Sequence, residues 1–401
     1  MNDGSQLEIP VGNRLMFSVR LAPRQGDRFQ PTGFPNIGPG IYRRPGGMQM
    51  LLVESSQSMA NRLEETIVAD GYSIIKELDG LPYVTSTIKI KHEDDIDPEQ
   101  KGKSEDVVTT SSLVEPHRLN SDFILNAKRD SNNEETFADE LIKEFQFERY
   151  RPVNWRIVVK TLFKYDPNTL LHGAFFSQLK DGRIKIPRAV SAFIEAENVE
   201  PAESGGVKKN IFDLSSNLEF VGNIKRKGGT QMIPFNRTEF TAEKITAYFN
   251  MDLSLLREYD AAVTKEKNDC SGKVANFLYL LSVYKIRRFL SRGLRLRSSC
   301  DLEVVDEEKK AALGSQSKTY PPALQLDVKT IEAELQRLIR ELRIFFAEPP
   351  VTKLETCMRP KRNKKEKNEE AGEANAGTDS ARTDEPEGSD SDGPSDEDSE
   401  E

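Results

Sequence analysis

A long segment between Gly26 and Gly47 is dense in glycine and proline, and this limits what the chain can form there. Proline removes a backbone hydrogen-bond donor and glycine weakens helices and strands, so neither element can continue through the segment. The sequence therefore predicts an extended loop. It lies between a predicted strand at Leu15–Leu21 and a second predicted strand at Met50–Val53.

The first part of this loop combines polar side chains with aromatic rings. Arg24, Arg28 and Gln30 could contact a phosphate or a sugar, and Phe29 and Phe34 lie close to them in the sequence. Proteins that bind single-stranded nucleic acid combine a basic groove with aromatic side chains on which bases stack. The segment fits that design. It fits equally well a structural Ω-loop in which the two phenylalanines anchor in the core.

Two further segments, 55–64 and 117–121, mix arginine, histidine, asparagine, glutamine and serine in the same way. Ser55 or Ser56 can cap a helix that runs to about Ala69. Such side chains suit the holding of a phosphodiester backbone. The candidate RNA-contacting residues in these segments are Ser58, Asn61, Arg62, His117, Arg118 and Asn120. A general-base role for the histidine is the alternative, although no partner nucleophile is evident.

The middle of the chain gives four further expectations. Trp155–Phe163 is rich in β-branched and aromatic residues and predicts a strand. Pro187 favours the start of a helix through Ala196, with a loop at 198–210 after it. Residues 220–240 predict a hairpin with a basic tip. The candidate RNA-contacting residues of that tip are Lys225, Arg226 and Lys227.

Towards the C-terminus, the clearest helix signal runs from Ser271, a good N-cap, to Arg292, where Gly293 ends it. Residues 294–298 alternate with period two and predict a strand. A second amphipathic helix is expected over Val328–Phe346, and the prolines at 349 and 350 mark the expected end of the ordered body.

Five cations are expected to gather where that helix meets that strand. Three fall on one helix face by their i, i+3, i+7 spacing, and two share one face of the strand. Such a surface could contact successive phosphates, and arginine can also stack on bases. The alternative is a solvated face whose cations pair with the acids at 301 and 303. The five cations are Lys285, Arg288, Arg292, Arg295 and Arg297.

The charge of the chain is unevenly distributed. Of its 401 residues, the last 36 (366–401) carry 15 Asp and Glu against two Lys and Arg, which leaves 55 basic and 51 acidic residues, a net charge of +4, in 1–365. The formal net charge of −9 therefore hides a mildly basic body, which is compatible with a nucleic-acid partner. The tail has no aromatic residue, so we expect it to be disordered. It could serve solubility, or compete with RNA for the basic surface.

Several functional classes find no support in the sequence. Cys270, Cys300 and Cys357 are isolated from one another and from histidine, so neither a zinc site nor a disulfide framework is expected. Asp166 is expected in a turn, without a second carboxylate for metal catalysis. The start lacks a signal-peptide pattern, and the longest apolar run, Phe277–Tyr284, is too short to span a bilayer. We therefore expect a soluble protein of the reducing cytoplasm, with no catalytic residues, metal or cofactor and no membrane partner.

Strands and helices alternate along the chain without a glycine-rich phosphate fingerprint. This pattern predicts an α+β fold with a ferredoxin-like core, as in RNA-recognition motifs, and long insertions. We expect one body over residues 1–355, with an acidic, mobile insertion at about 91–106, followed by a disordered, basic-then-acidic tail at 356–401.

Five stretches of the sequence resemble one known family. They are GDRFQPTGFPNIG (26–38), LLVESSQSMANRLE (51–64), TSSLVEPHRLNS (110–121), TLLHGAFF (169–176) and FLSRGLRLRSSCDLEVV (289–305). With them the chain resembles the backbone subunit of type I-G (formerly I-U) CRISPR effector complexes, in the Cas-seven branch of the repeat-associated mysterious protein superfamily. The insertion near 91–106 and the residues after about 350 have no counterpart in that resemblance.

The resemblance implies a ferredoxin-like core and several copies of the chain along one guide RNA (crRNA), whose spacer they hold for pairing with target DNA. It also implies contact with other subunits of the effector complex. RNA would be bound by Arg24–Thr32, Ser58–Arg62 and His117–Asn120. The resemblance also implies a projecting thumb hairpin, for which the predicted hairpin at 220–240 is the candidate by its pattern. Type I members of this branch do not cleave the target, so the resemblance implies a binding protein and not an enzyme.

Two alternatives remain open at this point. The first is a metal-independent endoribonuclease of the same superfamily that processes repeat RNA, with His117 as its base; it would need a glycine-rich loop near the C-terminal end, and none is visible. The second is a non-catalytic scaffold that holds a basic partner through its acidic tail.

Overall fold

The computed structural model describes residues 6–34, 37–91, 105–130, 134–148, 150–179, 182–210, 231–307 and 320–358. The chain divides into two units, of which one comprises residues 1–89 and 106–357 and the other residues 90–105 and 358–401. Only positions 90, 91, 105 and 358 of the second unit are described, each at the end of a strand. The following sections therefore concern the first unit.

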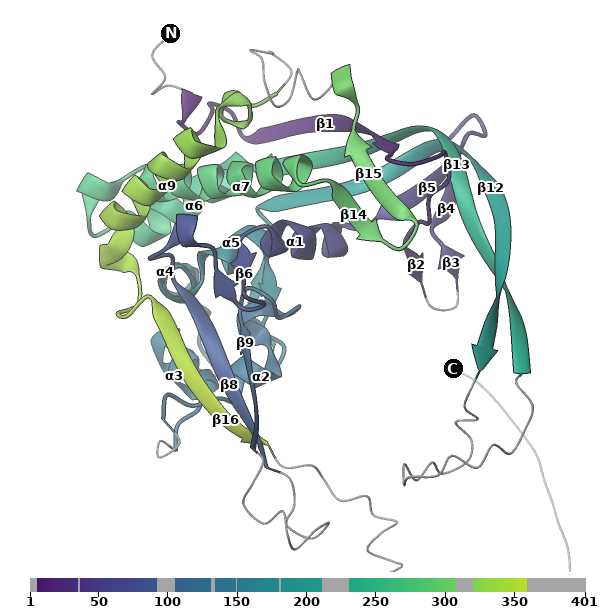
Figure 1. The fold of residues 1–401 in the computed structure, drawn as a ribbon. Helices are drawn as coiled ribbons and strands as arrows, with labels where there is room; N and C mark the ends of the chain where they lie inside the picture. The colour runs from purple at the N-terminus through teal and green to yellow at the C-terminus, as the bar shows by residue number, and fades with distance from the viewer. Residues whose placement is uncertain are drawn as a thin grey trace, which may run out of the picture. The chain divides into compact units, whose positions relative to one another are not determined.

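A seven-stranded sheet is the largest element of this unit (Figure 1). Its neighbouring strands pair antiparallel. In spatial order they are β14 (Leu294–Arg297), β15 (Cys300–Val304), β1 (Arg14–Pro23), β13 (Gln231–Asp252), β12 (Val190–Asn210), β5 (Gln49–Glu54) and β4 (Ile41–Arg43).

One face of this sheet is buried, as the alternation of residues in β1 shows. Phe17, Val19 and Leu21 are buried, whereas Ser18 and Arg20 between them are exposed. Phe17 stacks on Phe249, its cross-strand partner in β13, with ring centroids 5.1 Å apart. Such cross-strand aromatic pairs on the core side stabilise the sheet and fix its register.

The helices supply the other side of the core. α7 is buried almost all round, as expected of a helix at the centre of a protein, and it packs against α1, α5, α6 and α9. α1 also packs on β12, and α6 on β1. The helices are α1 (Ser56–Glu65), α2 (Asp122–Leu125), α3 (Phe137–Glu144), α4 (Trp155–Tyr165), α5 (Pro167–His172), α6 (Leu253–Thr264), α7 (Lys273–Ser291) and α9 (Val328–Leu342).

Smaller elements complete the described part. A three-stranded sheet has the order β16 (Val351–Met358), β8 (Tyr83–Lys91) and β9 (Glu105–Ser111). The two-stranded pairs are β2 (Gly33–Phe34) with β3 (Gly38–Pro39), β6 (Val68–Ala69) with β7 (Ser73–Ile74), and β10 (Ala174–Phe175) with β11 (Lys185–Ile186). Short 3-10 turns are η2 (Lys76–Leu78), η4 (Arg118–Asn120), η5 (Asn268–Cys270), η6 (Pro322–Gln325) and η7 (Arg343–Phe345).

The expected strand at Trp155–Phe163 is wrong, because this segment is helix α4. Asn154 caps it by accepting a hydrogen bond from the Ile157 N–H at 3.4 Å. Val158, Val159 and Leu162 face the core at helical spacing, whereas Arg156 and Lys160 lie on the outside and both contact Glu266. Burial of the apolar stripe outweighs the β propensity of the Ile-Val-Val run. The composition of the segment suggested a strand, but the spacing of its apolar residues is that of a helix.

The expected helix at 187–196 and loop at 198–210 are also wrong. Residues 190–210 form β12, which pairs with β13 along its whole length. Val190, Ala192, Ile194 and Ala196 are buried and alternate with less buried residues, which is the period of a strand. Alanine and glutamate are good helix formers, but here the partner strand decides the conformation.

The expected hairpin at 220–240 is displaced along the sequence. Residues 231–240 do lie in a hairpin, but they pair with 201–210 of β12. The proposed tip with Lys225, Arg226 and Lys227 lies outside the described residues, as do most of the insertion at 91–106 and the tail from 359 onward. The expected end of the body at the prolines 349 and 350 is wrong, because β16 continues to Met358.

Other expectations are confirmed. The strands at 15–21 and 50–53 are β1 and β5, and the helices at 271–292 and 328–346 correspond to α7 and to α9 with η7. The expected N-cap at Ser271 is wrong, because α7 begins at Lys273 after Gly272, an N-cap residue that makes no side-chain hydrogen bond. The strand at 294–298 is β14, with the alternation of buried and exposed residues that the sequence predicted. α1 ends at Glu65, earlier than expected, and the loop at 26–47 contains the short strands β2, β3 and β4. The mixed α and β class holds, and no described helix has the length and apolarity to cross a membrane.

Candidate nucleic-acid interface

Helix α1 is the element around which the three polar segments meet. Ser55 begins it by accepting a hydrogen bond from the Ser58 N–H at 3.3 Å, as a serine N-cap does. Met59 and Leu63 turn into the core. Among the polar side chains of α1, Ser58 and Arg62 contact Glu54, and Glu64 contacts Arg118.

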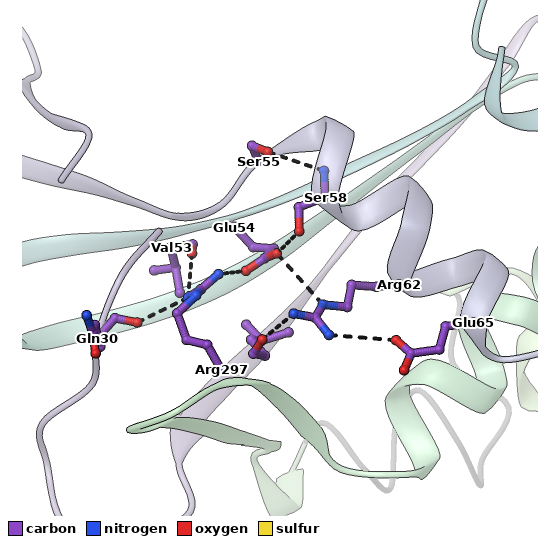
Figure 2. Close-up of polar contacts among 9 residues, drawn as sticks. Gln30, Val53, Glu54, Ser55, Ser58, Arg62, Glu65 and Arg297 are labelled. Atoms are coloured by element: carbon purple, nitrogen blue, oxygen red, sulfur yellow. Dashed lines mark hydrogen bonds and ion pairs between the residues drawn. The ribbon is translucent and has the colours of Figure 1, made fainter. Parts of the chain in front are cut away.

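Glu54, just before α1, gathers the first group of contacts (Figure 2). Its carboxylate is buried and accepts hydrogen bonds from the Ser58 hydroxyl and the Arg297 guanidinium. Arg62, one turn further along α1, lies 3.8 Å from the same carboxylate and donates to the carbonyl of Leu296. Three predicted residues from two distant segments, Ser58 and Arg62 from one and Arg297 from the other, therefore share one buried carboxylate.

Arg297 also fixes the loop from Arg24 to Thr32. Its Nη1 donates to the carbonyls of Gln30 and Val53, both at 3.1 Å (Figure 2). The Gln30 N–H donates to Ser299 O at 2.8 Å. Burial of the Arg297 guanidinium lowers its pKa, which is the expected cost of placing a cation among carbonyl groups. The loop is therefore held by specific hydrogen bonds on the β14 side.

Phe29 anchors the same loop from within. Its side chain is fully buried, and its backbone exchanges two 2.9 Å hydrogen bonds with Phe240 of β13. Of the two alternatives for this ring, the structure favours the core anchor over a platform for base stacking. Arg28, next to it, is exposed and lies 3.3 Å from Glu239. Arg24 is also exposed.

The segment 117–121 meets α1 on a different side. Arg118 has a φ of +54°, which is rare for a residue with a side chain, and its guanidinium is buried. Its Nε and Nη2 donate to the two carboxylate oxygens of Glu64, both at 2.7 Å, and Nη1 donates to Gly173 O at 3.1 Å. Arg118 therefore holds the segment in place and has little capacity left for a phosphate. His117 beside it is exposed.

Lys285 does not lie on an exposed basic face, contrary to the prediction. It is fully buried, donates to Asn168 Oδ1, and lies 2.9 Å from His172 Nε2. Burial lowers its pKa to about 8, opposed by the charges of Glu64 and Asp166. The sequence spacing placed Lys285 correctly beside Arg288 and Arg292, but spacing alone does not tell which side of a helix meets the core.

The remaining predicted cations lie closer to solvent. Arg288 is partly buried and donates to Thr66 O and to the Tyr284 hydroxyl, both at 2.9 Å. Arg292 and Arg295 are exposed. Arg292, at the end of α7, has its pKa lowered by burial and by the like charge of Arg288.

A hollow of about 580 Å³ lies between α1, η4, α5 and the β10–β11 pair. Four of the predicted residues contribute to its wall, together with others that sequence reasoning did not single out. Its lining residues are Gln57, Asn61, Pro116, His117, Arg118, Asn120, Asp122, His172, Gly173, Ala174, Phe175, Ser177, Gln178, Ile186 and Arg188.

Two polar atoms in this wall, His172 Nδ1 and Asn120 Oδ1, are buried and have no hydrogen-bond partner among the residues that the structure describes. Burial, together with the positive charges of Lys285, Arg118 and Arg188, lowers the pKa of His172 well below its usual value, so the ring is neutral. The Lys285 ammonium can only donate, so His172 Nε2 is the acceptor. The hydrogen of the ring therefore lies on Nδ1, which is an unused donor.

Within the described residues, no group of three histidine, cysteine, aspartate or glutamate side chains is placed to hold a metal ion. The hollow instead offers amides, imidazoles, one exposed guanidinium (Arg188) and one half-exposed aromatic ring (Phe175).

Sequence reasoning missed the acids that organise the site. Glu54 and Glu64 lie within or next to the segment 55–64, but a glutamate near an amphipathic helix gives no sign that it will be buried opposite an arginine. His172 and Phe175 were present in the TLLHGAFF stretch that carried part of the family resemblance. That stretch was the signal that could have identified them. Arg188, after Pro187, was hidden by the incorrect helix prediction there.

The part of the chain that contains these segments matches a known protein family. Residues 15–201 match the model of a family described as CRISPR-associated protein GSU0053. This range includes the three polar segments and every residue that lines the hollow. The match supports the interpretation of this chain as a CRISPR-associated protein.

Two other comparisons add less. No curated protein matches the chain. Among solved structures, a chain of a "CRISPR RNA-guided surveillance complex, pre-nicking" aligns with 82% of this chain and 87% of its own length, at 11% identity and a TM-score of 0.30. A score this low does not establish a shared fold.

Proposed function

We propose that this chain is the guide-RNA-binding backbone subunit of a type I CRISPR interference complex, of subtype I-G, and that copies of it line the RNA spacer for pairing with target DNA. The observation that carries the proposal is the convergence of the three polar segments on α1, within the range that matches the CRISPR-associated family.

The exposed side chains around that point are suited to a phosphodiester backbone. Arg24, Arg28, Arg292 and Arg295 are exposed cations, and Asn61 of α1 is an exposed amide. Buried ion pairs and carbonyl contacts fix the elements that carry them, so such a surface would be formed before RNA arrives. Phosphate and sugar contacts would leave base edges free to pair, which a subunit for variable spacers requires.

The sheet order supports the ferredoxin-like part of the proposal. The order β15-β1-β13-β12 forms the centre of the large sheet. Along the chain these strands and the helices between them follow β1, α1, β12, β13, α7 and β15 when the other elements are set aside. This succession matches the β-α-β-β-α-β order of ferredoxin-like domains and so supports that part of the proposal.

Binding to RNA is tested by titrating single-stranded RNAs of several sequences into the purified chain at a series of salt concentrations. We expect similar affinities for all sequences and a linear fall of log affinity with log salt, with a slope of about −0.7 for each phosphate contacted. An affinity that is independent of salt, or that depends strictly on spacer sequence, would contradict the proposal.

The proposal includes the absence of catalysis. The imidazole of His117 has no hydrogen-bond or ion-pair partner among the described residues, whereas a general base needs an orienting group and a substrate proton within reach. The chain and its His117→Ala variant should both leave repeat RNA intact during incubation without metal. Site-specific cleavage by the unmodified chain that is lost in the variant would favour the endoribonuclease alternative.

A further inference from the structure

One side of strand β9 is an open sheet edge. β9 lies at the edge of the three-stranded sheet, and none of the segments that the structure describes pairs with its other side (Figure 1). Val107 is 57% exposed and Val108 is 50% exposed. Successive side chains of a strand point to opposite faces, so each face of β9 carries one exposed valine. An open edge with apolar side chains is a template for pairing with another strand.

The other edges of the two larger sheets are short or occupied. β14 has four residues and β4 has three, and Arg62 donates a hydrogen bond to the carbonyl of Leu296 in β14. β16 exchanges backbone hydrogen bonds of 2.7 and 2.9 Å with Lys128 through Glu355. Short strands and covering segments are ways in which proteins protect an edge. β9, in contrast, has seven residues, and residues 107–111 include no lysine or proline.

The direction of the backbone groups of β9 follows from its contact with β8. Ser112, directly after β9, donates its N–H to Val84 O at 2.9 Å. Backbone groups alternate along a strand between its two sides, so Val108 directs its N–H and C=O towards β8, as Ser112 does. Val107 and Thr109 therefore direct their N–H and C=O groups towards the open side.

These positions make the edge complementary to a second copy of itself. When two β9 strands run antiparallel about a two-fold axis at Val108, Val107 of one copy lies opposite Thr109 of the other. Their outward N–H and C=O groups then exchange hydrogen bonds in both directions. The two Val108 residues form a non-hydrogen-bonded pair, in which the Cα atoms are about 4.5 Å apart and the side chains are close. β-branched residues in such cross-strand positions stabilise a sheet.

The charges of the strand favour the same arrangement. β9 begins with Glu105 and Asp106 and ends with Thr110 and Ser111. Antiparallel pairing about Val108 puts the acidic positions of one copy opposite the hydroxyl positions of the other, so like charges do not meet. Parallel pairing in register would put each acid opposite the same acid of the other copy. The strand therefore favours a two-fold symmetric, antiparallel partner.

We propose that two copies of this chain pair through β9, antiparallel and about a two-fold axis at Val108, without RNA. This inference goes beyond the proposed function. A two-fold contact closes on two chains and does not propagate, so it differs from a line of copies along a guide RNA. One strand pair is small beside the roughly 1,200–2,000 Å² of a stable interface, so we expect a dissociation constant on the order of micromolar.

Sedimentation velocity of the nuclease-treated chain, from sub-micromolar to high micromolar concentration, tests the proposal. We expect a monomer–dimer equilibrium that persists in about 1 M salt, because backbone hydrogen bonds and apolar contacts are little screened, whereas bridging by RNA is weakened. A chain that stays monomeric throughout would overturn the proposal. An association that is lost after nuclease treatment or in high salt would overturn it as well.

The two-fold axis is tested at Val108, the position that meets itself. Val108→Lys and Val108→Glu each bring like charges together and should weaken dimerisation about 5- to 30-fold, and an equimolar mixture should regain it at low salt. The controls are Val11→Lys and Val11→Glu, at a fully exposed residue outside the strands, and they should change nothing. A mixture no better than the single variants, or equal losses in the controls, would refute the pairing.

Thr109→Pro gives a test that does not depend on charge. It removes an N–H that points away from β8, and edge strands tolerate proline at such positions. Circular dichroism and the melting temperature should therefore show a retained fold, while dimerisation is lost. A folded variant that dimerises as tightly as the unmodified chain would contradict the proposed pairing.

Discussion

Arg118 and Glu64 form a bidentate ion pair in the protein interior, in which both hydrogen bonds measure 2.7 Å. The pair joins η4 to α1, two of the three polar segments that the sequence singled out. Burial raises the pKa of Glu64, and the charge and hydrogen bonds of Arg118 oppose that shift. The carboxylate therefore depends on the guanidinium to remain ionised.

Removal of Arg118 should destabilise the protein strongly. Arg118→Ala leaves Glu64 buried without its partner, for which a loss of about 3–5 kcal/mol in the free energy of unfolding is expected. Chemical denaturation measures this loss. The control is Arg151→Ala, which breaks an exposed pair with Glu148 and should cost less than about 1 kcal/mol.

The double variant Arg118→Met with Glu64→Leu should recover most of the stability, because neither buried charge remains to be compensated. A double variant as unstable as Arg118→Ala would mean that the cost comes from packing around η4.

The buried Lys285 predicts how stability changes with pH. Its pKa falls from 10.5 to about 8 in the folded protein, mainly through burial. Between these values the unfolded chain binds more protons than the folded protein, so the free energy of unfolding rises with pH from about 8 to 10.5. Below pH 8 this lysine is protonated in both states, so its titration no longer changes the free energy of unfolding. The full rise corresponds to about 3 kcal/mol.

Lys285→Met removes this contribution, so the measurement is the difference in slope between the two proteins from pH 8 to 10, by denaturation at each pH. Other groups that titrate there, such as Cys300 with a pKa raised by burial to about 11, contribute equally to both. Parallel curves would show that Lys285 stays charged in the folded protein.

Glu54 should be required for the order of the Arg24–Thr32 loop. Glu54→Gln removes the charge that faces both Arg62 and Arg297, which are themselves about a quarter exposed. A loss of about 2–4 kcal/mol is expected, slightly below that of a fully buried pair. In hydrogen exchange, the Gln30 amide should lose protection before the amides of β1. Glu65→Gln, at a largely exposed side chain, serves as the control and should change neither quantity appreciably.

Arg295 tests whether β14 contacts RNA. If its exposed guanidinium neutralises one phosphate, Arg295→Ala should weaken binding and make the salt slope less steep by about 0.7. Arg340, an exposed arginine on α9, provides the matched control. The same change in slope for Arg340→Ala and Arg295→Ala would indicate a general effect of net charge, without a local contact.

Sequence reasoning succeeded where a local pattern also decides the burial. The alternation in β1 and β14 and the long apolar run of α7 are of this kind. It failed at α4 and at the start of β12, where composition suggested one conformation and packing imposed another. For the site, the choice of segments could be made from the sequence because polar residues were concentrated there. The sequence could not predict that Arg118 is buried and Arg295 exposed. That difference depends on whether folding brings a distant acid to the side chain, as it brings Glu64 to Arg118.

The pairing of β12 with β13 has a mechanical consequence. Beyond the Phe29–Phe240 bridge, ten residue pairs from Pro201–Phe240 to Asn210–Gln231 continue as a ribbon of two strands (Figure 1). At about 3.3 Å for each residue, this ribbon is roughly 30 Å long. A rotation of about 10° at its base would therefore move its far end by about 5 Å. The base of the ribbon is attached to the Arg24–Thr32 loop. The attachment consists of the bridge between Phe29 and Phe240 and the contacts of Arg28 with Glu239 and of Gln30 with Arg237. A ligand that shifts this loop by a fraction of an ångström would therefore change the direction in which the β12–β13 ribbon projects.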